Sequence, residues 1–143
     1  MKAAPAGTRV PAGGGLTRPA FLWAPPVLYA AGIFLFSAMS EPPVLPGDLS
    51  DKFEHGLAYA GLTLLLVRAL AGGVWRGVTA RVCVRAAAIA ALYGATDELH
   101  QRFVPGREAD VLDLAADALG ASAAAALAGG WRRVVRARPD ARI

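Results

Sequence analysis

The stretch YGATDELHQRFVPGREADVLDLAADALG, residues 93–120, joins two apolar regions of the chain through a short polar connection. The Pro105-Gly106 pair marks a turn in the middle of this connection. After the turn, four residues recur at intervals of three or four, the spacing that places side chains on one face of a helix: Asp110, Asp113, Asp117 and Gly120. The stretch therefore predicts a helical hairpin whose connected ends carry carboxylates.

Apolar segments extend outward from this hairpin in both directions. Four of them divide the chain, at about residues 19–39, 51–75, 82–101 and 111–131. The chain of 143 residues is 55% hydrophobic and only 18% charged, which is apolar for a soluble domain. A membrane-spanning helix needs about 20 largely apolar residues. The sequence therefore predicts an all-α, polytopic membrane protein with four transmembrane helices in a compact bundle.

The basic residues predict how this bundle is oriented. Twelve of the fifteen Lys and Arg residues flank one set of segment ends, and ten of the eleven acidic residues lie at or near the other set. The three basic residues on the acidic side are Lys52, Arg102 and Arg107. Because Lys and Arg collect on the cytoplasmic side of membrane proteins, both termini are predicted to be cytoplasmic. The acidic ends then face outward from a bacterial inner membrane.

This topology divides the chain into a membrane domain and two tails. We predict a flexible, basic cytoplasmic tail at residues 1–18, a four-helix membrane domain at 19–131 and a second basic cytoplasmic tail at 132–143. An alternative for residues 1–40 is a cleaved signal peptide, because a basic tail and an apolar run precede the small residues SAMS. The basic residues are read as topology determinants, so no nucleic-acid partner is expected.

Polar residues interrupt the apolar pattern at the outer segment ends. In DKFEHGLAY, residues 51–59, Asp51, His55 and Tyr59 are spaced four apart and share one helix face. Ionisable groups inside membrane spans are costly and mark candidate functional sites. Together with the acidic stripe after the turn, they predict one polar cluster built from three helix ends. Arg107 is expected to grip a carboxylate of this cluster with its planar guanidinium.

These segments resemble the VanZ-like family of small membrane proteins. The resemblance covers about residues 51–120 and rests on twelve positions in order: Asp51, Lys52, His55, Tyr59, Glu98, Gln101, Pro105, Gly106, Arg107, Asp113, Asp117 and Gly120. One departure is Asp117, where the family pattern most often has Asn. The resemblance implies a cell-envelope protein linked to resistance to the glycopeptide teicoplanin, an antibiotic.

The expected site combines these patterns. We expect a polar or anionic ligand, such as a membrane lipid or a lipid-linked cell-wall precursor, to bind at the outer leaflet through nine residues: Asp51, Lys52, His55, Tyr59, Glu98, Gln101, Arg107, Asp113 and Asp117. The cations Lys52, His55 and Arg107 would contact the ligand, and carboxylates would orient them.

Two other classes of function stay open. A membrane-embedded hydrolase or transferase would use His55 or Glu98 as general base, and a non-catalytic assembly partner would use the small residues Ala116, Gly120, Ala124 and Ala128. Oxygen-rich metal binding by His55, Glu98, Asp113 and Asp117 is conceivable, but no metal-binding motif supports it. The sequence therefore leads us to expect no metal or other cofactor, leaves catalysis undecided and leaves the oligomeric state open.

Overall fold

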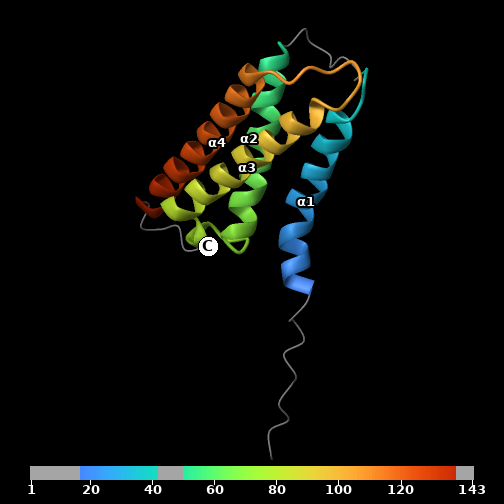
Figure 1. Cartoon of the computed structure of the whole chain (residues 1–143). Helices are drawn as coiled ribbons and strands as arrows, with labels where there is room; N and C mark the ends of the chain where they lie inside the picture. The colour runs from blue at the N-terminus through green and yellow to red at the C-terminus, as the bar shows by residue number, and fades with distance from the viewer. Residues whose placement is uncertain (1–16, 42–49, 138–143) are drawn as a thin grey trace, which may run out of the picture.

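The chain folds into four long helices, as a computed structural model describes it over residues 17–41 and 50–137 (Figure 1). Within these ranges there is no strand, which confirms the predicted all-α class. In chain order the elements are α1 (Thr17–Ser37), α2 (Asp51–Leu70), the short 3-10 helix η1 (Trp75–Gly77), α3 (Ala80–Gln101) and α4 (Val111–Ala137).

Two helix ends differ clearly from the sequence-based bounds. α2 ends at Leu70 because Gly72 and Gly73 follow with positive φ angles of 68° and 77°. α4 continues to Ala137, so the first half of the predicted tail at 132–143 is helical. The rest of that tail, most of the predicted tail at 1–18 and residues 42–49 lie outside the described residues.

Helices α2, α3 and α4 pack against one another, while α1 lies along α2 and α3 (Figure 1). The end of α1, the start of α2 and the α3–α4 connection lie together at one end of the bundle. The opposite end holds the start of α1, the α2–α3 connection and the end of α4. The polar helix ends named from the sequence are therefore neighbours in space.

Two prolines lie inside α1 and do not mark its start. Pro25 has no N–H to donate to the carbonyl of Phe21, four residues earlier. Arg68 of α2 donates from Nη1 to this carbonyl oxygen at 3.5 Å, and its guanidinium lies 4.9 Å from the centre of the Phe21 ring. Arg68 thereby joins α2 to α1 and satisfies an acceptor that the proline leaves open.

Small side chains make up much of the interior of the bundle. Ala86 and Ala90 of α3 and Ala121 of α4 are fully buried beside Tyr59 and Leu62 of α2. The small-residue stripe of α4 lies against α2, and a methyl group at Gly120 would run into the carbonyl oxygen of Gly56. Small residues at such a crossing let two helix backbones approach closely.

Large apolar side chains lie instead on the outside of all four helices, among them Leu28, Leu64, Leu92, Leu119 and Leu127. By length and composition, two helical segments are apolar enough to cross a membrane: Pro19–Ser37 in α1 and Val111–Val135 in α4. Helices α2 and α3 do not reach this measure, because each carries charged residues at both ends. The structure thus confirms four long helices, two of which are long and apolar enough to cross a membrane, while the four-span bundle with cytoplasmic termini stays a prediction.

Candidate functional site

Lys52 connects the start of α2 to the start of α4. Its ammonium nitrogen lies 2.6 Å from Oδ2 of Asp110 and 2.5 Å from Oδ1 of Asp113. Asp51 lies farther away, at 3.5 Å, and is exposed. Asp113 is buried, so Lys52 neutralises a carboxylate that would otherwise be costly to remove from water.

His55 lies one helical turn below Lys52 and faces Asp117. Its Nδ1 forms a hydrogen bond with Oδ1 of Asp117 at 3.0 Å. Asp117 is only 1% exposed, and its Oδ2 has no hydrogen-bond partner among the described residues. The close contact between Gly56 and Gly120 lies beside this pair and holds α2 and α4 near enough for it to form.

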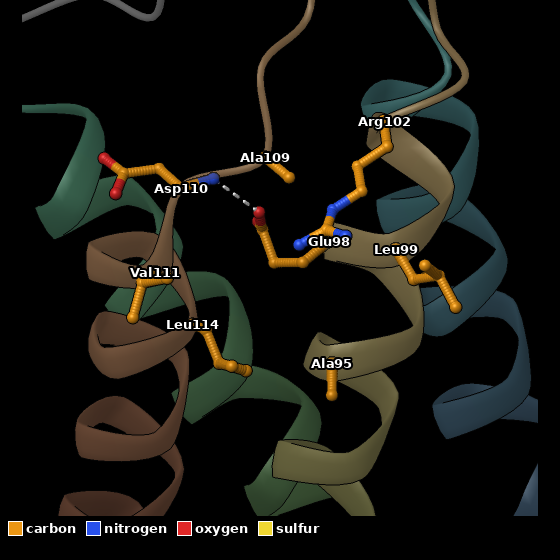
Figure 2. A pocket seen from close by; sticks show the side chains of 8 residues that line it. All are labelled: Ala95, Glu98, Leu99, Arg102, Ala109, Asp110, Val111 and Leu114. Atoms are coloured by element: carbon orange, nitrogen blue, oxygen red, sulfur yellow. Dashed lines mark hydrogen bonds between the residues drawn. The ribbon is translucent and has the colours of Figure 1, made fainter.

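Glu98 is the carboxylate that α3 adds to the cluster. Its Oε2 accepts a hydrogen bond from the backbone N–H of Asp110 at 3.0 Å, which fixes the start of α4 against α3 (Figure 2). Its Oε1 is buried and has no partner among the described residues. Asp97, also buried, accepts a weak hydrogen bond of 3.5 Å from Gln101 on the same helix.

A groove opens beside this cluster, between α3 and the first turns of α4 (Figure 2). Its volume is about 280 Å³. The apolar part of its lining is Ala95, Leu99, Ala109, Val111 and Leu114, and the polar part is Glu98, Arg102 and Asp110. The groove therefore offers an apolar wall and charged groups of both signs to one molecule.

The structure brings most of the predicted site residues together. Lys52, His55, Glu98, Asp113 and Asp117 form one cluster at the three helix ends. Their carboxylates outnumber the two basic groups, so this cluster is acidic in character.

The remaining predicted residues lie at its edges or elsewhere. Tyr59 is buried below His55, and its hydroxyl has no partner among the described residues. Gln101 is also buried, and its side chain donates to Asp97 and not to a residue of the cluster.

Arg107 does not take the expected position. Its Nε donates to the carbonyl oxygen of Met39 at 3.1 Å, and its Nη2 donates to that of Phe36 at 3.5 Å. No carboxylate pairs with it among the residues that the structure describes. Arg107 therefore donates to backbone carbonyl groups where α1 ends, of which that of Phe36 also accepts from the backbone N–H of Met39 at 3.1 Å, and the expected carboxylate clamp is wrong.

Sequence reasoning missed two groups that contribute to the site. Arg102 lines the groove next to Glu98, and Asp110 anchors both Lys52 and Glu98. Both could have been found from the charge pattern. Asp110 begins the acidic stripe, and Arg102 is one of the three basic residues on the acidic side of the chain. The ammonium group of Lys52 holds the pKa of Asp110 below its ordinary value.

The cluster also contains two sets of three potential metal ligands. Asp51, His55 and Asp113 form one set, and His55, Glu98 and Asp117 form the other. Within each set the ligand atoms lie within 4.8 Å of one another. The second set is the more buried of the two.

Comparison with known proteins identifies a family for this chain. No curated protein and no solved structure matches the chain. A family model described as VanZ/LLP1 matches residues 32–132, which include all of α2, α3 and the polar cluster. Because this match covers most of the 143 residues, the chain belongs to the VanZ/LLP1 family.

Proposed function

We propose that this chain is a multi-pass protein of the bacterial inner membrane that binds a lipid-anchored, anionic ligand at its outer face. The ligand class is that of a lipid-linked cell-wall precursor, which has a phosphate-containing head group and a long apolar chain. Such a role in the envelope is consistent with a family linked to glycopeptide resistance. The proposal rests above all on the groove between α3 and α4.

The lining of the groove matches both parts of such a ligand. Leu99, Val111 and Leu114 offer an apolar wall along which a lipid chain can lie. Arg102 provides a guanidinium at the same groove, and planar guanidinium groups bind phosphate oxygens well. Lys52 is partly exposed and forms an ion pair with Asp110, which also lines the groove. We therefore assign the anionic head group to Arg102 and Lys52.

The distribution of side chains supports insertion of the whole bundle in a membrane. Large apolar residues are exposed on all four helices, whereas many of the buried residues are alanines or carry polar side chains. Arg76, Arg81, Arg132 and Arg133 lie near the end of the bundle opposite the polar cluster. An excess of Arg at that end supports the proposed orientation, with that end in the cytoplasm and the groove at the outer face.

The test of the ligand is a binding measurement in lipid nanodiscs, with a purified undecaprenyl-pyrophosphate-linked precursor as the probe. Arg102→Ala removes a charged contact worth about 1.5–3 kcal/mol, so affinity should fall about tenfold or more. Leu99→Trp should fill the apolar wall and weaken binding as well. Arg133→Ala, an exposed change at the other end of α4, is the matched control.

Equal binding by the wild-type chain and both groove variants would refute the proposal. Binding of phosphatidylglycerol with the same affinity as the precursor would assign the groove to bulk anionic lipid.

The orientation is tested separately in a Cys83→Ala background. A cysteine placed at the exposed Glu108 should react with a membrane-impermeant reagent from the outside only.

One observation favours a second candidate, a membrane-embedded hydrolase or transferase. Asp117 orients the imidazole of His55 through a 3.0 Å hydrogen bond, as a carboxylate orients a general base. In this case His55→Ala would abolish turnover of the precursor while leaving its binding and the helical fold intact. A binding protein would show no turnover in either form.

A further inference from the structure

We infer that His55, Glu98 and Asp117 bind one divalent metal ion of the zinc or manganese class. The three side chains come from three helices, α2, α3 and α4, and their ligand atoms lie within 4.8 Å of one another. One imidazole nitrogen with two carboxylate oxygens is a donor set that suits Zn²⁺, with a coordination position left open. The site goes beyond the proposed function and does not depend on it.

Unpartnered oxygen atoms in the cluster point to a missing cation. Oε1 of Glu98 and Oδ2 of Asp117 are buried, and neither has a hydrogen-bond partner among the described residues. The exposed fractions of these residues are only 7% and 1%. A buried carboxylate without a partner is costly, and a nearby metal ion would remove that cost.

The spacing of two of the ligands already suits one shared ion. Nδ1 of His55 lies 3.0 Å from Oδ1 of Asp117. Metal–ligand bonds of about 2.0–2.2 Å place neighbouring donor atoms roughly 3.0–3.5 Å apart on one ion. The ligand atom that Glu98 offers lies within 4.8 Å of those of His55 and Asp117, and its Oε2 accepts a hydrogen bond from the backbone N–H of Asp110. Such an outer hydrogen bond is typical of carboxylate ligands.

The charges of the cluster also favour a dication. Lys52 pairs with Asp113 and Asp110, so its charge is already shared by two carboxylates. In their ionised forms, Glu98 and Asp117 bring two negative charges to His55, which coordinates a metal ion as neutral imidazole. One divalent ion brings this set of three side chains to zero net charge. Protonation of His55 alone would leave a net negative charge in a buried site.

The experiment uses the full chain in nanodiscs, treated with a chelator and then titrated with Zn²⁺ alone. We expect one Zn²⁺ per chain and a rise in melting temperature on binding. Glu98→Gln and His55→Asn should each weaken binding at least about tenfold, because loss of even an outer partner of a ligand costs about 10–100-fold. Glu108→Gln and His100→Gln are matched controls outside the set and should bind like the wild type.

Two results would overturn the inference. One is the absence of saturable uptake of a single equivalent, and the other is undiminished binding by Glu98→Gln and His55→Asn. If these variants lose the circular dichroism signal of their helices, they are unfolded and cannot test the site. X-ray absorption of the zinc-bound wild type then identifies the ligands of the metal ion. A shell of oxygens with one imidazole supports the site, and a shell without imidazole contradicts it. No lipid-linked precursor is added in this test, so its failure leaves the proposed function standing.

Discussion

Substitution of Gly120 by alanine should separate the two helices that carry most of the polar cluster. The added methyl carbon would lie well inside the 3.0 Å that such carbons keep from other atoms, and the atoms it meets are the backbone of Gly56. Backbone atoms cannot rotate away as the end of a side chain can. Helices α2 and α4 must therefore move apart by about an ångström or more, and a gap of 0.5–1 Å already forfeits about a quarter to a half of each contact energy.

The stability lost by overpacking at Gly120 is partly offset by the higher helix propensity of alanine. Overpacking of a tight interface costs about 1–3 kcal/mol, and alanine recovers up to about 1 kcal/mol through its higher helix propensity. Because α2 and α4 form a long contact, we expect the upper part of this range to apply, for a net loss of about 2 kcal/mol. The shift should also lengthen the contact between His55 and Asp117.

The measurement is reversible unfolding in mixed micelles, followed by circular dichroism. Gly130→Ala, later in the same helix, is the matched control, since a methyl group there meets no atom within 4 Å. This control should be neutral or more stable by up to about 1 kcal/mol. If Gly120→Ala unfolds at the same denaturant concentration as Gly130→Ala, then the backbones of α2 and α4 are not in contact and the reasoning is wrong.

Three further predictions concern the cluster and its surroundings. Gly94→Ala places a methyl carbon 2.8 Å from Oδ2 of Asp117 and should lower the melting temperature; an unchanged melt would mean that this carboxylate lies elsewhere. Arg107→Lys should cost about 1 kcal/mol in an unfolding titration, because lysine cannot reach both carbonyl oxygens where α1 ends; equal stability would remove Arg107 from that role. The pKa of Asp110 is lowered by Lys52 in the folded state, so its contribution to stability is present above about pH 4 and is lost as the pH falls through the lowered pKa. Melting temperatures of the wild type and Asp110→Asn should therefore differ at pH 7 and converge in acid, and a constant difference would argue against this ion pair.

Much of this structure follows from local patterns in the sequence. The spacing of Asp110, Asp113 and Asp117 places them on one helix face, and apolar runs of suitable length define four helices. The order of the polar positions also predicted a VanZ-like protein, which the family match confirms. These features depend on helix periodicity and on residue order, which a sequence carries directly.

Other features depend on how the helices pack in three dimensions. Arg107 was expected to bind a carboxylate, but α1 ends next to it and offers carbonyl groups instead. The carbonyl of Phe21, to which Pro25 has no N–H to donate, accepts instead from Arg68, 47 residues away. No local pattern states which distant group will satisfy an open acceptor, so these two assignments required coordinates.

The order in which the chain is synthesised gives the polar contacts of α2 a further consequence. Lys52 precedes its partner Asp110 by 58 residues, and His55 precedes Asp117 by 62. A nascent chain in which α2 has left the ribosome therefore carries Lys52 and His55 before Asp110 and Asp117 have been made, although Asp51 is already present beside Lys52. Until Asp110 and Asp117 emerge, the polar contacts that join α2 to the start of α4 cannot form. Completion of the last helix is then the event that fixes α2 in the bundle.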